Sequence, residues 1–491
     1  MPLLNLPSEV LDQIVWESIP EEFENLIGSC RTLYECGKPY IRQHRIRKKQ
    51  YHQMNIQGCF DASRLVDFMQ EPRISYYATT VDLREQHGTR SENSSTARDR
   101  EDVKKRVQTL IKQSPYLAFE GVDPDFWIDM ILSDLGDADN YSDHNLFLGI
   151  FYLTFFPNVT NLTLPWSTPG GIPYHDNNKA TNQYELVMNA IARESRSQHN
   201  RRALRKLKRL NYLLVPDYNI RQRLQFLLPF LTLPELEELY ANSLTAIDFH
   251  QEFKWSHPET HSNLHVIELV HCCMDAVGIS ELLAHTPNLT TFKYGHASKH
   301  HGMESYWDAG EFVAAIEKYV GGQLRHLAVT VEINAANGIN AGVTSMHGFN
   351  KLETLEMDLL TFYGPSVESG EKAGILNTPP NPGFTKWTVD AIPPLCKVLP
   401  ACLQEFNLFA HSWNNMGIDD KTMKLLYDGF RSARPSYLPN LNRCTVRFAV
   451  QPRQQFIPHS VEVYKHLKAE GVDYSVLLVN PRSQRDDWEI L

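Results

Sequence analysis

Nine copies of one short leucine pattern recur along this chain of 491 residues. The pattern is L-x-x-L-x-L with substitutions, and its copies begin at Val159, Leu207, Leu236, Leu264, Leu289, Leu324, Leu352, Leu403 and Leu441. Alternation in the second half of each copy predicts a short strand with its apolar side chains on one face. Consecutive starts lie 25 to 51 residues apart, and recurrence at about 20 to 50 residues is typical of stacked repeats.

Helix-like patterns lie between the predicted strands. Apolar residues at helical spacing predict helices over 185–193, 221–230, 275–285, 312–320 and 421–430. A helix around 461–467 and a strand over 474–479 would close the C-terminal end. One strand and one helix per unit predict a curved α/β solenoid over 151–480, in which each repeat buries its neighbour's face.

These repeats resemble leucine-rich repeats, whose period is about 20 to 29 residues. Regular repeats of that family place Asn or Cys three residues after the last Leu of the motif. Here only Cys272, which follows Leu269, obeys this rule. The repeats are therefore degenerate, and an ordinary α/β domain with frequent leucines is the alternative.

The first fifty residues carry a second pattern, which predicts three short helices. Pro7 suits the start of a helix, and Ser8 is a good cap for its first amides. Val10, Leu11 and Ile14 follow at helical spacing. A second helix is expected after Pro20-Glu21-Glu22, and a third opens near Cys30 and is expected to be interrupted by Gly37 and Pro39.

This N-terminal pattern resembles the F-box. The matching positions are Leu6, Pro7, Glu9, Val10, Leu11, Ile14, Cys30, Arg31, Leu33, Tyr34 and Pro39. One departure is Glu22-Phe23, where the family often has Asp-Leu. The resemblance implies docking on the Skp-type adaptor of a cullin ubiquitin ligase, through Leu6, Pro7, Val10, Leu11, Ile14, Phe23, Leu26 and Cys30. The alternative is an ordinary N-terminal helical subdomain packed on its own protein.

The chain thus divides into an F-box-like region at 1–50, a helical connector at 51–150, the repeats at 151–480 and a tail at 481–491. Within the connector, residues 84–106 are almost entirely polar and are expected to form a mobile loop. Together with the N-terminal pattern, the repeats resemble the irregular leucine-rich-repeat region that follows the F-box in many fungal proteins.

Composition narrows the function classes. The net charge of −10 argues against general nucleic-acid binding. No apolar run approaches the 18 or so residues of a membrane span, and acidic residues come too early for a secretory signal. Eight cysteines without a CxxC pair suit the reduced thiols of a cytoplasmic or nuclear protein.

A search for catalytic or metal-binding patterns yields no candidate site and no cofactor. The chain has no P-loop, nucleophile elbow or HExxH motif. Histidines at 257, 261, 265 and 271 lie near Cys272 and Cys273, but Pro258 and a predicted strand keep them from converging. Basic runs at 42–49 and 201–209 suit solvated helix ends or approaches to strands, with a phosphate or import-receptor patch as the alternative.

The surface expected to bind a target protein is the concave face of the repeats. Residues between or beside the strand leucines should face it, namely Glu238, Tyr240, Glu268, Lys293, His326, Glu356, Asp358, Phe409 and Arg443. Mixed aromatic and charged side chains on adjacent strands suit protein binding. The Gly- and Pro-rich segment 361–388 is either a recognition loop or disordered.

These patterns favour a non-enzymatic substrate-recognition subunit of a Skp–cullin–F-box ubiquitin ligase. In that hypothesis the N-terminal helices hold the adaptor, and the repeats hold an unknown target. A repeat scaffold without a ubiquitin role is the first alternative, and an unrecognised hydrolase is the second.

Overall fold

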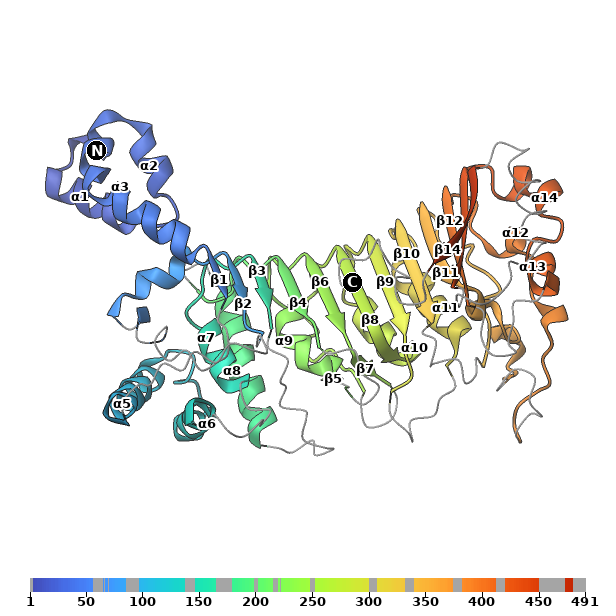
Figure 1. Cartoon of the computed structure of the whole chain (residues 1–491), viewed down its shortest axis with the longest axis horizontal. Coiled ribbons are helices and arrows are strands. Elements are labelled where there is room, and N and C mark those ends of the chain that lie inside the picture. The colour runs from blue at the N-terminus through green and yellow to red at the C-terminus, as the bar shows by residue number, and fades with distance from the viewer. Residues whose placement is uncertain are drawn as a thin grey trace. The chain divides into compact units, whose positions relative to one another are not determined.

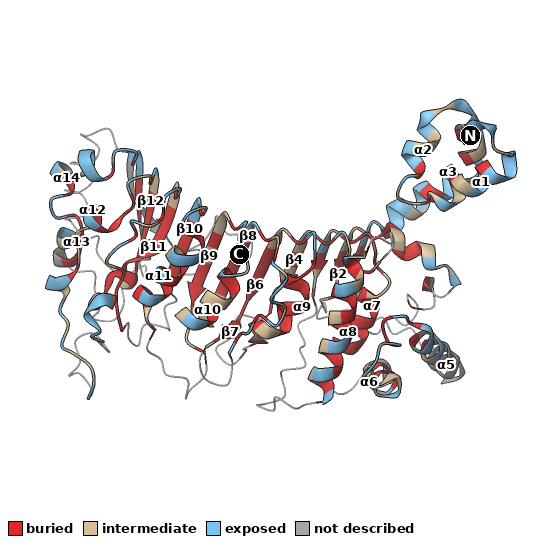
Figure 2. Ribbon diagram, turned by 180° about the vertical axis from the view of Figure 1, so that it is seen from behind, coloured by how far each residue is buried: buried red, intermediate tan, exposed pale blue. Residues whose placement is uncertain are grey.

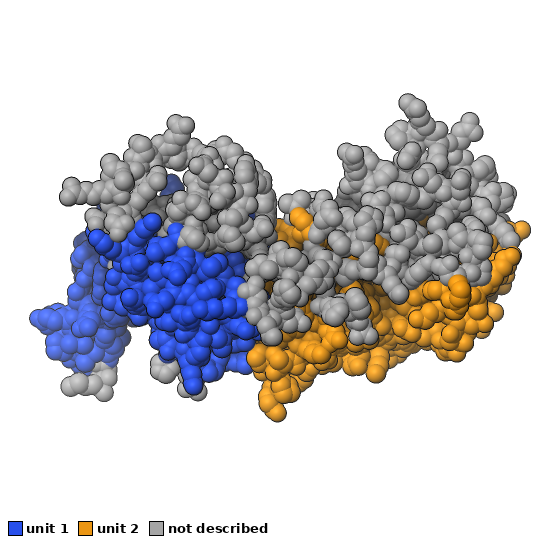
Figure 3. All heavy atoms as spheres, turned by 90° about the horizontal axis from the view of Figure 1, so that it is seen from below, with its two compact units in different colours: residues 1–212, 233–236 blue, residues 213–232, 237–491 orange. Residues whose placement is uncertain are grey.

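The protein is a mixed α/β protein in the computed structural model (Figure 1). The structure describes residues 3–55, 65, 67–68, 70–84, 97–136, 146–164, 179–197, 202–214, 220, 222–247, 252–299, 307–331, 340–373, 382–411, 420–449 and 473–479. The chain divides into two compact units (Figure 3). Unit 1 is Met1–Tyr212 with Leu233–Leu236, and unit 2 is Leu213–Thr232 with Glu237–Leu491.

Unit 1 begins with three α-helices after the short turn η1 (Leu3–Asn5). They are α1 (Ser8–Glu17), α2 (Phe23–Ser29) and α3 (Arg31–Tyr51). Leu11, Val15, Phe23 and Leu33 are buried between them. Gly37 matters here, because a Cβ added to it would press on the side chains of Ile27 and Phe23 in α2. The absence of a side chain at Gly37 therefore lets α2 approach α3 closely.

Two details differ from the sequence-based prediction. Pro7, not Ser8, is the cap residue of α1, and the Ser8 hydroxyl instead donates to the Glu9 carboxylate at 3.3 Å. The third helix is also not interrupted, since α3 runs through Gly37 and Pro39 to Tyr51. Packing of Gly37 against α2 compensates for the weak helix propensity of both residues, which is how tertiary context overrides local preference.

Side-chain contacts tie the N-terminal helices to the turn η2 (Pro72–Tyr77). Arg73 donates to the Trp16 carbonyl at 2.7 Å and to the Glu17 carboxylate at 2.8 Å, and its guanidinium lies over the Trp16 ring. The buried His44 ring lies 3.1 Å from the Tyr77 hydroxyl, and burial lowers the His44 pKa. The α1–α3 segment is therefore anchored to the following turn at both α1 and α3.

A buried amide adds another link within unit 1. Asn158 Nδ2 donates to the Glu21 carboxylate at 3.1 Å and to the Tyr76 carbonyl at 2.8 Å. Its Oδ1 accepts from Lys206 Nζ at 2.8 Å. One side chain thus joins the chain before α2, the η2 turn and the approach to the fourth strand.

The rest of unit 1 alternates short parallel strands with helices. Its elements are β1 (Gln53–Asn55), β2 (Thr80–Asp82), α5 (Ala97–Gln113), α6 (Pro124–Gly136), α7 (Leu146–Leu153), β3 (Asn161–Thr163), α8 (Lys179–Ser195) and β4 (Arg209–Tyr212). The strands pair in the order β1-β2-β3-β4. Val81, Leu162 and Leu210 occupy one row and are fully buried.

Helix α5 corrects the expectation of a polar loop over 84–106. Residues 97–106 are helical, while residues 85–96 lie outside the described residues. Ala, Arg, Glu and Lys dominate this stretch and are strong helix formers, so high polarity did not mean absence of structure. Burial of Val107 and Ile111 one turn apart anchors the helix.

Unit 2 is a series of parallel strands with helices between several of them. The strands are β5 (Gln222–Arg223), β6 (Glu238–Asn242), β7 (Leu244–Ala246), β8 (Val266–Met274), β9 (Thr291–His296), β10 (His326–Val331), β11 (Thr354–Asp358), β12 (Glu405–His411), β13 (Arg443–Ala449) and β14 (Asp473–Val479). The helices are α9 (Leu228–Leu231), α10 (Ala276–Leu283), α11 (Ala309–Val320), α12 (Leu395–Val398), α13 (Asp420–Leu426) and α14 (Phe430–Tyr437). The strands from β6 to β14 pair in chain order, except that β5 and β7 form a side sheet with the end of β8.

The strand positions confirm the leucine pattern. Each of its nine copies contains or directly precedes a strand, from β3 to β13. The second apolar positions of the copies in unit 2 form one row of buried residues across the sheet, namely Leu239, Ile267, Phe292, Leu327, Leu355, Phe406 and Cys444. Figure 2 shows these strands as mostly buried.

Helices α10 and α11 lie on one face of the strands of unit 2 (Figure 1). The row of buried residues belongs to the same face, because Phe292 precedes Tyr294 by two residues in β9 and the Tyr294 ring meets α11. On that face, the Tyr294 ring of β9 packs on the Phe312 ring of α11 with centroids 4.5 Å apart. Asp275 caps α10 by accepting from the Gly278 amide at 2.7 Å, as the predicted helix over 275–285 requires. We call this the inner face and the opposite side of the same strands the outer face.

Two predicted helices of unit 2 are wrong in extent. The stretch 221–230 holds the strand β5, a 3-10 turn and only then α9, because Pro229 must sit at a helix start. The stretch 421–430 is split between α13 and α14, with Gly429 between them at φ +62°. The predicted helix at 461–467 lies outside the described residues.

Buried polar side chains hold the turns that follow the strands. Asn242 accepts from the Leu214 amide at 2.6 Å and donates to the Leu214 carbonyl at 2.8 Å. On the next strand, the Cys272 thiol has the same role, since it lies 3.4 Å from the Leu244 amide. Ser243 and His271, beside these two residues, have positive φ values of 56° and 54°. The chain that follows β4 and the chain that follows β6 are thus each held by a side chain of the next strand in the sheet.

Replacing Asn242 with Ala should destabilise unit 2. The change would leave both backbone groups of Leu214 unpaired in a buried site, and each such group costs about 1–3 kcal/mol. The matched control is Asn211→Ala in β4, whose amide makes a half-buried hydrogen bond of 3.2 Å to Thr163. Urea denaturation checks the expectation. Equal midpoints for the two variants would contradict the role of Asn242.

His296 should make stability depend on acid pH. Its ring is fully buried and stacks on Trp307 with centroids 4.2 Å apart, and burial lowers the pKa of His296 to about 3. An unfolded His has a pKa of about 6.5. This contribution to stability is therefore complete above about pH 6.5 and is lost as the pH falls toward about 3.

The test compares urea midpoints of wild type and His296→Phe between pH 7 and pH 4, about the range over which the His proton is taken up. The Phe ring keeps the stack on Trp307 but cannot bind a proton. We expect a shallower pH dependence in the variant. Parallel curves would show that His296 is protonated without unfolding.

Candidate functional site

Residues 3–10 present an apolar edge to solvent. Leu3, Leu4 and Val10 are 41%, 50% and 41% exposed, and Pro7 is also exposed. Of the residues expected to bind an adaptor, Leu6, Ile14, Leu26 and Cys30 are partly exposed. Large apolar side chains in such a position are available to a partner protein.

Leu11 and Phe23 do not belong to this edge, which corrects their assignment as contact residues. They are only 3% and 1% exposed, and they lie in the core between α1, α2 and α3. The spacing of apolar residues predicted the apolar side of each helix. It could not predict which of those residues pack against the other two helices and which remain open to a partner. Conversely, Leu3 and Leu4 were missed, although two adjacent leucines before the Pro7 helix start are visible in the sequence.

Helix α1 is fixed in place beneath the exposed edge. The Tyr40 hydroxyl of α3 donates to the Asp12 carboxylate at 2.9 Å, and this hydrogen bond raises the pKa of Tyr40. The Tyr40 ring also packs on Trp16 of α1, with centroids 5.2 Å apart. A partner would therefore meet α1 in a preformed position, which lowers the entropy lost on binding.

The outer face of unit 2 carries the second candidate surface. Strand pairing places one residue of each strand in a central row, which runs through Tyr240, Glu268, Lys293, Ala328, Glu356, Asn407, Thr445 and Ser475. The predicted common register of Tyr240, Glu268, Lys293 and Glu356 is thus confirmed. A parallel row lies two residues earlier, through Glu238, Val266, Thr291, His326, Thr354, Glu405, Arg443 and Asp473.

Much of the central row is closed to solvent, contrary to expectation. Glu268 is 1% exposed and forms an ion pair of 3.5 Å with Lys293, while Glu356 and Tyr240 are 7% and 6% exposed. Asp358 and Phe409, from the next row along the strands, are 0% and 2% exposed. Alternation predicts the side of a strand on which a residue lies, but it carries no information on what covers that side.

The earlier row remains accessible. His326 is exposed, and the Arg443 side chain is 54% exposed beside Glu405, to which it donates at 3.1 Å. Glu238 is partly exposed, and so is Lys293 at 22% of its side chain. Of the residues proposed for target binding, these four are therefore the ones that a partner could reach.

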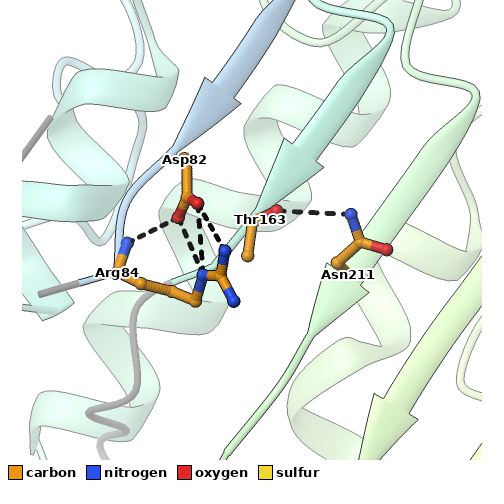
Figure 4. Close-up of polar contacts among 4 residues, drawn as sticks. All are labelled: Asp82, Arg84, Thr163 and Asn211. Carbon is orange, nitrogen blue, oxygen red and sulfur yellow. Dashed lines mark hydrogen bonds and ion pairs between the residues drawn. The ribbon is translucent and has the colours of Figure 1, made fainter. Parts of the chain in front are cut away.

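Unit 1 has its own polar outer surface, which the sequence patterns did not reveal. Arg84 donates hydrogen bonds to both carboxylate oxygens of Asp82, from Nη2 to Oδ2 at 2.6 Å and from Nε to Oδ1 at 3.0 Å (Figure 4). This hydrogen bonding raises the pKa of Arg84. On the next strands, Asn211 donates to the Thr163 hydroxyl at 3.2 Å. The only sequence signal is the Asp-Leu-Arg spacing, which puts both charged groups on one side of the strand.

The basic run 201–209 and the segment 361–388 have partners within the chain. In the basic run, Arg202 pairs with Glu194 at 3.3 Å, and Lys206 holds Asn158. In the segment 361–388, the Tyr363 and Trp387 rings lie 5.5 Å apart, and the Thr385 amide donates to the Lys372 carbonyl at 2.7 Å. Both ends of that segment are therefore packed, while residues 374–381 lie outside the described residues.

Metal-binding groups do not gather in the portion of the chain that the structure describes. No cluster of three or more His, Cys, Asp or Glu side chains there could hold an ion. Of the histidines considered from the sequence, His261 stacks on His285 with ring centroids 5.5 Å apart, and His285 in turn stacks on Trp255 at 4.7 Å. Among the same residues, the helices are too short or too polar to cross a bilayer.

Comparison with known proteins adds no assignment to this geometry. No protein-family model matches the chain, and no curated protein is similar to it.

Proposed function

We propose that the chain is the substrate-recognition subunit of a Skp–cullin–F-box ubiquitin ligase. In this proposal, α1–α3 form an F-box-like head that binds a Skp-type adaptor. The repeated strands form an irregular leucine-rich-repeat solenoid that binds the target. Ubiquitin transfer would be accelerated by proximity within the assembly, not by chemistry in this chain.

The observation that carries the adaptor half is the exposed apolar edge at the F-box-like positions. Val10 and Pro7 are exposed, whereas Leu11 and Val15 of α1 are buried. A small helical unit that keeps apolar residues in water at one edge is suited to completing its burial against a partner. The Asp12–Tyr40 bond supports this by holding that edge still.

The repeat half is supported by the inner row and by the bends after the strands. Buried apolar residues align from Leu239 to Cys444 across parallel strands, as stacked repeats require. Asn242 and Cys272 hold the adjacent turns, and Asn and Cys are the residue types that leucine-rich repeats have after the strand. Asn242 is the last residue of its strand, so the expected spacing concealed it.

Co-expression with a Skp-type adaptor tests the proposal directly. The full chain and the adaptor should elute together in size-exclusion chromatography at micromolar concentration. Addition of the cullin amino-terminal domain should then give a larger complex. If wild type and adaptor elute separately, the ubiquitin-ligase role is rejected. The remaining alternative would then be a repeat scaffold without a ubiquitin role, which binds a partner protein through the outer face of unit 2.

Target binding should depend on the accessible row of unit 2. We expect that His326→Ala combined with Arg443→Ala weakens target binding by at least tenfold, because truncating central contact residues costs more than about 1 kcal/mol each. Exposed substitutions change stability by only about 0.5 kcal/mol. Quantitative mass spectrometry of proteins bound to wild type and variant measures the effect.

The matched control for this pair is Lys351→Ala combined with Lys397→Ala. Both lysines are exposed in unit 2, and neither belongs to a strand. The control should retain every partner. Equal partner lists for the two double variants would move the target site away from this row.

A further inference from the structure

One side of α3 is a strip of basic residues. Lys38, Arg42, Arg45 and Lys49 follow one another at spacings of four, three and four residues, and they lie at the helix surface. Such spacing puts them on one side of a helix. The opposite side of α3 holds the buried Leu33, Gly37, His44 and Tyr51.

Ion pairs divide the cations of α3 into two groups. Lys48 pairs with Glu24 at 2.7 Å, Arg47 donates to Glu71 at 2.6 Å, and Lys38 lies 3.5 Å from Glu35. These three serve contacts within unit 1. Arg42, Arg45 and Lys49 form no hydrogen bond or ion pair through their side chains among the residues that the structure describes. Among the described residues, three positive charges on one side of one helix are therefore without an ion-pair partner, in a protein whose net charge is −10.

An apolar side chain lies among these charges. Ile46 is 54% exposed, and it lies one turn from Arg42 and one turn from Lys49. Arg42, Arg45, Ile46 and Lys49 together are called the α3 basic face below. A solvated helix end needs cations but gains nothing from an exposed isoleucine, whereas a protein-binding face combines an apolar centre with a charged rim.

We propose that the α3 basic face docks an acidic amphipathic helix of a partner protein. Two turns of helix separate Arg42 from Lys49, a rise of about 10 Å. Acidic residues three or four apart on a partner helix would meet that span, and an apolar residue between them would cover Ile46. The face is on a different helix from Val10, so it goes beyond the adaptor-binding edge and does not depend on it.

Other ligands fit this face less well. A nucleic-acid backbone would use the cations but leave Ile46 in water, and the net charge of the chain would oppose its approach. A membrane surface is bound by several apolar residues on one helix side, whereas among the described residues α3 exposes only Tyr34 and Ile46 as large apolar side chains, and these lie about three turns apart. A second copy of this chain could present Glu9 and Asp12 of its own α1, which are three residues apart, but both carboxylates already accept hydrogen bonds, from Ser8 and from Tyr40.

The test uses fluorescence anisotropy of a labelled peptide with the full-length chain. The probe is a peptide that forms an amphipathic helix with Glu at positions i, i+3 and i+7 and Leu at i+4. The control peptide has the same composition in scrambled order. Wild type should bind the helical probe at micromolar concentration and at least fivefold more tightly than the scrambled one. The affinity should fall steeply as salt rises, because exposed charges carry it.

Variants locate the site. Arg42→Glu with Arg45→Glu and Lys49→Glu should weaken binding at least tenfold, and so should Ile46→Asp. The matched control reverses three cations of α5, in Lys105→Glu with Arg106→Glu and Lys112→Glu, which changes the net charge equally. This control and Val10→Asp should bind the probe like wild type. A loss in the α5 control equal to that in the α3 variant would overturn the proposal.

Parallel measurements separate the rival ligands from the proposed one. Tighter binding of a duplex oligonucleotide or of phosphatidylserine vesicles than of the peptide would overturn it, as would equal binding of both peptides. So would salt-sensitive self-association in sedimentation velocity that Ile46→Asp abolishes. If wild type fails to bind a Skp-type adaptor while the peptide results hold, the ubiquitin-ligase role fails and the α3 basic face stands.

Discussion

Leu355→Asp should unfold the central strands of unit 2. Leu355 is fully buried in β11, and its neighbours in the inner row are Leu327, 2% exposed, and Phe406, 0% exposed. An ionised carboxylate there has no partner, and leaving a charge unpaired in an apolar interior costs several kcal/mol. Since the total stability of a domain is about 5–15 kcal/mol, this one change removes a large fraction of it.

A matched control exists on the adjacent residue of the same strand. Thr354 precedes Leu355, lies on the outer face and is partly exposed. Thr354→Asp introduces the same charge but keeps it in contact with water, so the urea midpoint should hardly change. The midpoint of Leu355→Asp should fall by at least about 1 M urea or become unmeasurable, with proteolysis spreading to neighbouring strands. Equal midpoints would show that the inner row is not a shared core.

Val10→Asp should abolish adaptor binding without unfolding α1. Val10 is 41% exposed, so an aspartate there remains hydrated in the free protein. In a complex the same carboxylate would be buried against apolar surface, and charges left unpaired at an interface cost several kcal/mol. Affinity should fall by more than a hundredfold in surface plasmon resonance with immobilised adaptor.

Ile46→Asp is the control for this measurement. It adds the same charge to another exposed apolar residue of the N-terminal helices, on α3 instead of α1. We expect it to leave adaptor binding intact and to remove only the interaction of the α3 basic face. If both variants lost adaptor binding, the edge at Val10 and the α3 basic face would belong to a single adaptor-binding surface.

The sequence predicts the inner row well because a single physical rule determines it. A strand has a period of two, so Leu239, Leu327 and Leu355 must share a face once the strands lie in register. The same rule identified the common register of Glu268 and Glu356. It could not predict their burial, since burial depends on what approaches from outside the strand.

Two kinds of element were not predicted from the sequence: very short strands, and a helix whose unfavourable residues are stabilised by packing. Strands β1 and β2 have three residues each and only one buried apolar residue apiece, Met54 and Val81, which is too little for a periodic signal. Helix α3 contains Gly37 and Pro39, which local propensity assigns to a break. The helix continues because α2 packs against Gly37. This contact cannot be predicted from residues 31–51 alone, because it depends on residues of α2.

The three contacts of Asn158 bear on chemical modification. Asn158-Val159-Thr160 is an acceptor sequence for N-linked sugar. A glycan on Nδ2 would remove a hydrogen that this nitrogen donates to Glu21 or Tyr76, and it would need space beside a residue that is only 7% exposed. In a compartment where oligosaccharides are attached, glycosylation of Asn158 would therefore compete with the folding of unit 1. In the cytoplasm, the Asn158 amide would remain unmodified and could join the three segments of the chain.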